Sequence, residues 1–212
     1  MSNVADRDLG RDKHMVPMTE RKAEIVGVAG RLMAERGIDG ASLRHIGDAV
    51  GMRRGSLYAH FDAKEEIVEL VLGPALVALR GVLSEPPEAG QSALNHLRAR
   101  FQAAVQCTIE YRDAFLILFQ DRRLIDESVL LRPLSDQANA ITPLWIKLIE
   151  AGQAEGSLRS DLHPTTIALG LYALLVAAFS NRHLGLEEAG GQLDPDAIVG
   201  HVVTLFFDGV LT

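Results

Sequence analysis

The chain has 212 residues, of which 48% are hydrophobic, and a formal net charge of −7 at pH 7. This length allows one substantial core or a small domain beside a larger one. Its one cysteine, Cys107, excludes an intrachain disulfide and is interpreted as a small core residue. The charge is uneven, because residues 1–64 carry 11 Lys and Arg against 9 Asp and Glu, whereas residues 65–212 carry 10 against 19. Two parts with different partners are therefore expected.

Residues 1–18 are polar and charged, and they predict a flexible N-terminal arm. Its basic side chains would either contact a DNA minor groove or simply remain solvated. From residue 19 the pattern becomes helical, and the first helix is expected over 19–36. Its buried stripe is Ile25, Val28, Ala29, Leu32 and Met33.

Residues 42–61 are the most informative stretch, because they predict two short helices joined at Gly51. Ser42 is a good N-cap, and a glycine just past a helix end turns the chain sharply. In the second helix Leu57 and Phe61 would face the core, leaving a small-residue outer face able to approach base edges. This is the pattern of a helix-turn-helix that binds DNA. The alternative is an ordinary helical corner whose charged residues are only solvated.

Further helices are expected from about residue 64 and over 91–110, 112–123, 127–151, 164–181 and 195–210, with no strand. Pro74 is expected to bend or break the helix that starts near Lys64, because an interior proline removes a hydrogen bond. Pro86 and Pro87 mark a clearer boundary. The fold class is therefore all-α.

The pattern from Glu20 to Leu72 resembles the TetR family of transcriptional regulators. The matching residues are Ile25, Ala29, Leu32, 34–37, Leu43, Ile46, Gly51, 55–58, His60, Phe61, Lys64 and Glu65. The resemblance implies a three-helix DNA-binding domain over 19–64, followed by a helical ligand-binding and dimerisation bundle over 65–212. It also implies a homodimer on a palindromic double-stranded operator.

Eight residues are candidates for DNA contacts. The resemblance implies phosphate contacts for Ser42, Tyr58 and Lys64, and base or backbone contacts from the two helices of the motif. The side chains at the start of the second helix also suit bidentate contacts to guanine. The candidates are Ser42, Arg44, Arg53, Arg54, Ser56, Tyr58, His60 and Lys64. The chain departs from the family pattern at Arg53, where a Ser or Thr cap is usual, at Gly47, which replaces an alanine, and at Ala59, which replaces a larger side chain.

Bulky side chains of the middle helices form either a plain core or the wall of an effector pocket. They are Phe101, Val105, Phe115, Leu118, Phe119, Trp145, Leu148 and Tyr172. Arg122 and Arg123 would receive an anionic head group or lie solvated at a helix end.

The last two helices are more apolar than one narrow stripe requires. This surface packs either inside one subunit or, as the resemblance implies, in a four-helix dimer interface. The candidate interface residues are Leu171, Leu175, Phe179, Val202 and Phe206.

No metal-ligand spacing, phosphate-binding loop or nucleophile elbow stands out, so no catalysis, cofactor or metal is expected. The longest apolar run, over 167–179, is shorter than the roughly 20 residues that span a bilayer, and there is no signal sequence, so a cytoplasmic protein without a membrane partner is expected. The function expected is that of a ligand-responsive regulator, a repressor released by a small apolar or acyl-type ligand. The alternative is an architectural or protein-docking DNA binder without a small-molecule switch.

Overall fold

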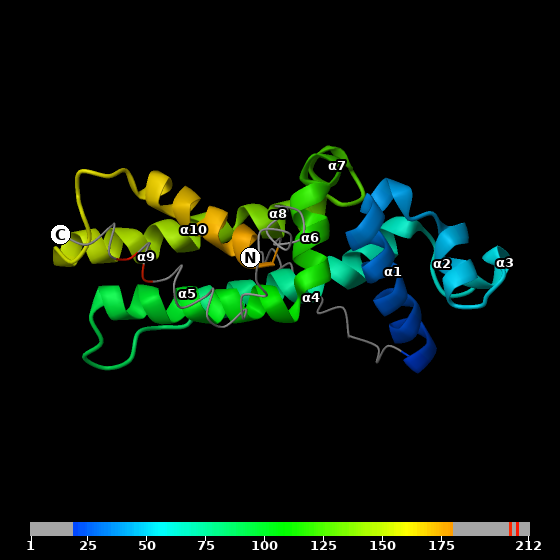
Figure 1. Cartoon of the computed structure of the whole chain (residues 1–212), viewed down its shortest axis with the longest axis horizontal. Helices are drawn as coiled ribbons and strands as arrows, with labels where there is room; N and C mark the ends of the chain where they lie inside the picture. Colours follow the sequence, from blue (N-terminus) through cyan, green and yellow to red (C-terminus); the bar gives the residue numbers. More distant parts are fainter. Residues whose placement is uncertain (1–18, 180–203, 205–206, 208–212) are drawn as a thin grey trace, which may run out of the picture.

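The computed structural model describes residues 19–179 together with Thr204 and Phe207, and its ten elements in this part of the chain are all α-helices. The expected N-terminal arm, and most of the helix expected over 195–210, lie outside the described residues. The all-α fold class is confirmed. The molecule is elongated, with α1–α3 at one end and α5, α9 and α10 extending to the other (Figure 1). The helices are α1 (Glu20–Gly40), α2 (Leu43–Ala49), α3 (Arg54–Leu57), α4 (Lys64–Ser84), α5 (Ala93–Glu110), α6 (Arg112–Gln120), α7 (Arg122–Glu127), α8 (Arg132–Asn139), α9 (Ile141–Glu155) and α10 (Pro164–Phe179).

Local signals account for the first three helices. The Thr19 side chain accepts a hydrogen bond from the Lys22 amide and so caps α1, which supplies a buried stripe to the core. Leu57 and Phe61 are 1% and 2% exposed, as their spacing predicts. They belong to the same buried cluster as residues of α1 and α4, and α1 packs against α4, so the small N-terminal unit shares its core with α4.

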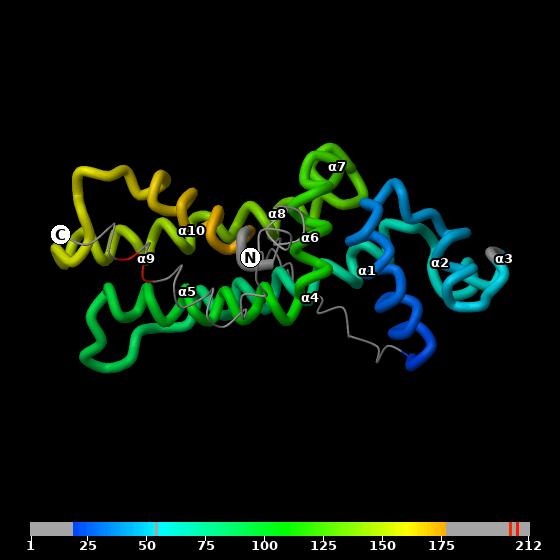
Figure 2. The backbone as a smooth tube through the Cα atoms, in the orientation of Figure 1, coloured from blue at the N-terminus to red at the C-terminus, as the bar shows by residue number. Residues whose placement is uncertain are grey.

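The predicted interruption at Pro74 is wrong, because α4 runs from Lys64 to Ser84 with the proline inside it. An interior proline costs about 3 kcal/mol. Buried residues on both sides, such as Leu72 and Leu76, anchor the helix against α1, α5, α6, α8 and α9. Packing therefore outweighs the missing hydrogen bond. Figure 2 shows α4 leaving the α1–α3 end and continuing into the bundle.

Among the described helices, α4 is also the one long and apolar enough to cross a membrane by length and composition. The apolar run over 167–179 belongs to the shorter helix α10. The buried side chains of α4 and its neighbours on several sides are those of a core helix.

Two expected long helices are each divided. The one expected over 112–123 breaks at Asp121 into α6 and α7, and the one expected over 127–151 breaks into α8 and α9. Pro133 and Pro143 lie in the first turns of α8 and α9, where a missing amide donor costs little. The prolines thus mark new helix starts, a signal that the longer prediction ignored.

Candidate DNA interface and effector pocket

The turn between α2 and α3 has the geometry that the sequence predicts. Gly51 has a φ of 68°, and the Met52 amide donates to the Gly47 carbonyl at 2.8 Å. A Cβ added at Gly47 would lie 2.9 Å from the Met52 oxygen and 3.2 Å from Leu57 Cδ1. The departure from the family's alanine therefore fits the tight approach of α3 to α2 in this chain.

Ser42 caps α2 as predicted. Its Oγ accepts from the His45 amide at 3.2 Å, and the Ser42 amide in turn donates to His45 Nδ1 at 3.3 Å. The pair is a capping box with histidine in the place usually held by Glu or Gln. The role of His45 was not predicted, because the usual capping-box pattern has Glu or Gln at this position.

The other candidate DNA-binding residues lie around α2 and α3. Arg44 has an 81% exposed side chain and lies 3.7 Å from Asp48. Arg53 is the N-cap of α3 without a side-chain capping bond, and it is exposed. Ser56 is exposed and Tyr58 is 48% exposed.

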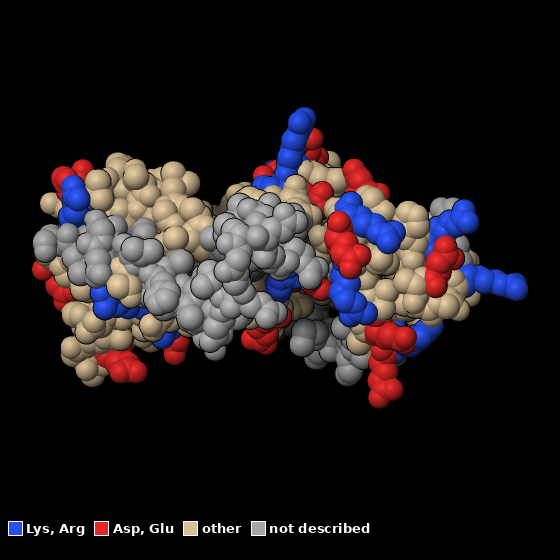
Figure 3. Space-filling model, in the orientation of Figure 1, with Lys and Arg blue, Asp and Glu red and all other residues tan. Residues whose placement is uncertain are grey.

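The second helix is shorter than predicted, because α3 ends at Leu57 and leaves Tyr58, His60 and Phe61 after it. Two candidates of this region need separate mention. His60 is half-buried and stacks at a tilt on Phe61, with ring centroids 6.4 Å apart. Arg54 begins α3, but its side chain lies outside what the structure describes. On the face shown in Figure 3, basic and acidic side chains alternate over the end of the molecule that holds α1–α3.

Lys64 is placed differently from the expectation of a phosphate contact. Its Nζ donates to the Ile38 carbonyl at 2.9 Å and lies 3.8 Å from the Asp39 carboxylate. Only 22% of its side chain is exposed. The lysine therefore ties the start of α4 to the end of α1.

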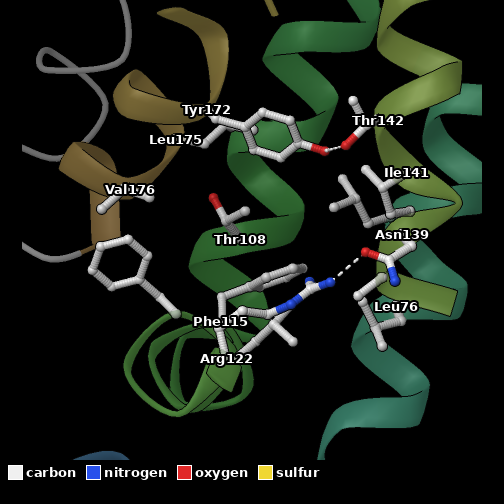
Figure 4. A pocket seen from close by; sticks show the side chains of 14 residues that line it. Leu76, Thr108, Phe115, Arg122, Asn139, Ile141, Thr142, Tyr172, Leu175 and Val176 are labelled. Carbon is white, nitrogen blue, oxygen red and sulfur yellow. Dashed lines mark hydrogen bonds between the residues drawn. The ribbon is translucent and has the colours of Figure 1, made fainter. Parts of the chain in front are cut away.

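The bundle contains a cavity of about 430 Å³, partly open to solvent, and mostly apolar (Figure 4). It is lined by Leu76, Leu79, Thr108, Phe115, Leu118, Phe119, Arg122, Ala138, Asn139, Ile141, Thr142, Tyr172, Leu175 and Val176. Four of the predicted residues line it: Phe115, Leu118, Phe119 and Tyr172.

The other four predicted pocket residues, Phe101, Val105, Trp145 and Leu148, are core residues away from this lining. Trp145 is fully buried and meets Phe101 edge to face, with centroids 6.1 Å apart. Phe101 in turn contacts Phe207, so the space beside them is filled by other rings. Aromatic content alone does not distinguish a filled core from a cavity.

Two polar pairs lie on the cavity wall. Thr142 Oγ1 and the Tyr172 hydroxyl are 3.0 Å apart, and burial raises the pKa of Tyr172 although the bond to Thr142 opposes this. In the second pair Arg122 Nη2 donates to Asn139 Oδ1 at 2.5 Å. Figure 4 shows the pairs separated along the cavity, with Thr108 between them.

Arg122 is held by a small network beyond the wall. Its Nε donates to the Asp126 carboxylate at 2.9 Å, and Ser135 Oγ donates to the same carboxylate at 2.6 Å. The bond from Arg122 and then that from Ser135 lower the pKa of Asp126. By contrast, the Arg123 side chain is 88% exposed and pairs with Glu127 on its own helix. Of the two arginines suggested for an anionic group, only Arg122 lines the cavity.

Sequence reasoning missed the polar residues Thr108, Asn139 and Thr142, as well as Leu76 and Leu79 of α4. None belongs to a motif, and each becomes recognisable only when helices distant in sequence come together. Cys107 is buried as expected, and burial raises the pKa of its thiol to about 11.

The structure describes two of the five candidate dimer-interface side chains. Leu171 and Leu175 are 0% and 4% exposed within one protomer, and Leu175 faces the cavity. Burial inside the subunit accounts for both, so neither offers an exposed surface to a partner. The side chain of Phe179, and Val202 and Phe206, lie outside the described residues. Leu169, on the same helix, is 63% exposed.

Comparison with known proteins gives a consistent result. The sequence model of the family described as "Bacterial regulatory proteins, tetR family" matches residues 25–71, which include α2 and α3. The chain is 34% identical over 194 residues to the HTH-type transcriptional repressor KstR2 of Rhodococcus jostii (strain RHA1), covering 90% of this chain and 91% of that protein. KstR2 of Mycolicibacterium smegmatis is 31% identical over 143 residues, covering 67% and 69% of the two chains.

Solved structures share the fold. The ketosteroid transcriptional regulator KstR2 of Mycobacterium tuberculosis superposes with a TM-score of 0.76 at 21% identity, covering 92% of this chain and 96% of that chain. The structure of AibR in complex with isovaleryl coenzyme A and operator DNA superposes with a TM-score of 0.71 at 18% identity. It covers 89% of this chain and 98% of that chain. The relatives are named as transcriptional repressors rather than enzymes. The chain therefore belongs to the TetR family of helix-turn-helix transcriptional regulators.

Proposed function

We propose that the effector of this repressor is an apolar acyl compound with an anionic or carbonyl-bearing end, and that its binding releases the homodimer from a palindromic operator. The observation that carries the proposal is the cavity of about 430 Å³ inside the bundle. That volume falls in the range of small-molecule sites, which are mostly apolar with a few polar anchors.

The wall of the cavity suggests the chemistry of its occupant. Apolar side chains from five helices would surround a hydrocarbon chain or ring system. The hydroxyls of Thr142 and Tyr172 would bind a carbonyl oxygen, and the partly exposed side chain of Arg122 would attract a carboxylate or phosphate. An acyl thioester combines these features, and AibR, which shares the fold, has been solved with isovaleryl coenzyme A.

We further propose that residues 19–64 bind DNA and that residues 65–212 bind the effector and dimerise. DNA contacts come from Arg44, Arg53, Arg54 and neighbouring residues of the α2–α3 region. The protein acts by binding alone, without catalysis, and works in the cytoplasm. The cavity favours this function over that of an architectural DNA binder, which needs no internal site.

A matched pair of variants tests the effector site. Operator fragments are first selected from random oligonucleotides, and release is then followed by fluorescence anisotropy with isovaleryl coenzyme A, octanoyl coenzyme A, octanoate and free coenzyme A. An acyl probe that binds the folded state raises the melting temperature by mass action. Arg122→Gln is expected to weaken the binding of that probe by about tenfold or more, because a charge-assisted hydrogen bond is lost. Arg123→Gln, one residue away and outside the cavity, is expected to leave it unchanged.

The proposal fails if none of the four probes raises the melting temperature or releases DNA. It also fails if the two arginine variants lose equal affinity, because the effect would then be a general one of charge. Free coenzyme A serves as the control for binding through the nucleotide alone.

A further inference from the structure

The structure contains an unusual exchange of hydrogen bonds between α1 and the α6–α7 junction. Gly37 has a φ of 74° and a ψ of 165°, so α1 kinks there. In a regular helix the Ile38 amide would donate to the Ala34 carbonyl four residues earlier. Here the Ile38 amide donates to Asp121 Oδ2 at 2.8 Å, and Gln120 Nε2 donates to the Ala34 carbonyl at 3.3 Å. Both ends of the interrupted bond are satisfied by the other unit.

Asp121 makes this contact instead of capping its own helix, α7. It is the N-cap residue of α7, a position at which an aspartate usually accepts from amides of its own helix. Its side chain makes no such capping bond and reaches α1 instead, across 83 positions of sequence. A Cβ on Gly37 would lie 3.2 Å from Asp121 Oδ1, so the glycine also makes room for the carboxylate.

The contact lies between the cavity and the DNA-binding unit. Arg122, the next residue, lines the cavity and bonds to Asn139. On the other side, Lys64 holds the Ile38 carbonyl, so the amide and the carbonyl of Ile38 are both fixed from outside α1. Four positions after Ile38, Ser42 caps α2. The path from the cavity to the helix-turn-helix is therefore short and polar.

We propose that Asp121 is a positioning residue that couples the effector cavity to the DNA-binding unit through the amide of Ile38. An occupant that displaces Arg122 from Asn139 shifts the α6–α7 junction. Asp121 then either pulls the end of α1 along or loses its hydrogen bond to the Ile38 amide. In both cases the position at which α2 begins changes. The inference rests on the cavity being the effector site, but it is tested without any effector.

The test is a double-mutant cycle on the full-length protein, read by hydrogen–deuterium exchange of peptides that cover residues 36–42. Asp121→Asn is nearly isosteric and is expected to speed exchange at Ile38 on the order of tenfold, the change for a weakened charge-assisted bond. Arg122→Gln, which acts from the cavity side, is expected to speed it about threefold in the wild-type background. In the Asp121→Asn background Arg122→Gln is expected to have no further effect, because the connection is already lost.

The control is Arg123→Gln, which is expected to leave exchange in residues 36–42 unchanged. The proposal would be overturned if Arg122→Gln changed the exchange rate of residues 36–42 by the same factor in both backgrounds. It would also be overturned if Asp121→Asn left that exchange rate unchanged. An effect of Arg123→Gln as large as that of Arg122→Gln would also overturn it, since α7 would then be loosened in general. Asp121→Glu keeps the charge and is expected to recover part of the protection and of the response to Arg122→Gln. Failure of the acyl probes to bind would contradict the proposed effector class while the result of this cycle still holds.

Discussion

Lys22 and Glu66 form a 2.7 Å ion pair that joins α1 to the first turn of α4. Glu66 also accepts from the Asp62 amide at 3.0 Å, and Lys22 Nζ lies 4.9 Å from the centroid of the Phe61 ring. Burial raises the pKa of Glu66, but the hydrogen bonds from Lys22 and Asp62 outweigh it, so the pKa lies below its ordinary value of 4.5.

Because the folded state lowers this pKa, the charged form of Glu66 stabilises the protein above its unfolded pKa, and the contribution disappears as the pH falls through the folded pKa. Glu66→Gln is therefore expected to lower stability at pH 7 by about 0.5–1 kcal/mol, the size of a partly exposed pair. The difference from wild type should vanish in acid, well below pH 4.5. Urea denaturation at pH 7 and in acid measures it, and a pH-independent difference would contradict the assignment.

Ser42 tests whether the cap of α2 and DNA binding can be separated. Ser42→Ala removes the acceptor for the His45 amide and is expected to cost about 0.5–2 kcal/mol of stability. Ser42→Asp keeps a capping acceptor, so stability should be largely retained while the added negative charge weakens DNA binding. If both variants bind DNA equally well, Ser42 lies away from the duplex.

Arg44 and Lys64 should behave differently in a salt titration. The Arg44 side chain is exposed, and Arg44→Ala is expected to reduce the salt slope of operator binding by about 0.9 if it neutralises one phosphate. Lys64 is bound to Ile38 and Asp39, so Lys64→Ala should cost about 1 kcal/mol of stability and leave the slope nearly unchanged. A full unit lost from the slope in Lys64→Ala would restore its expected role as a phosphate contact.

Arg54 remains the candidate for reading bases, on sequence grounds. Arg54→Ala is expected to cost on the order of 1–3 kcal/mol on the selected operator and to relax sequence preference. Competition between operator and random DNA measures this. Equal losses on both would show that Arg54 contacts only the backbone.

Tyr172→Phe removes the hydroxyl that pairs with Thr142 between α9 and α10. The expected change in stability is about 1 kcal/mol, since one partly buried hydrogen bond is lost. Binding of an acyl probe should fall further, because an apolar ring cannot bind its carbonyl. Thr142→Val removes the other hydroxyl, so a double-mutant cycle by calorimetry shows whether the two act as a pair.

The parts of the fold that could be predicted depend on short-range chemistry. Ser42, Gly51, Leu57 and Phe61 have their expected places because capping, positive φ and helical spacing act over a few residues. The interruption expected at Pro74 was wrong because packing of α4 on many helices is a long-range effect.

The candidate site was predictable only in part. Phe115 and Tyr172 face the cavity, whereas Phe101 and Trp145 are covered by other rings, and all four are large aromatic residues in the sequence. Whether such a residue meets a void depends on helices far away in the chain. The bond from Ile38 to Asp121 is of the same kind, since neither residue belongs to a motif that would pair them.

The uninterrupted course of α4 limits how this protein can be divided. Ile67, Val68 and Leu72 lie beyond residue 64 but are buried, and α4 packs against α1. A fragment ending at residue 64 would leave the apolar side of α1 open to water, however complete its DNA-reading helices. A DNA-binding fragment that folds must therefore include several turns of α4. In a chimera with another effector-binding domain, the two halves of this helix would have to be joined so that their buried faces stay aligned.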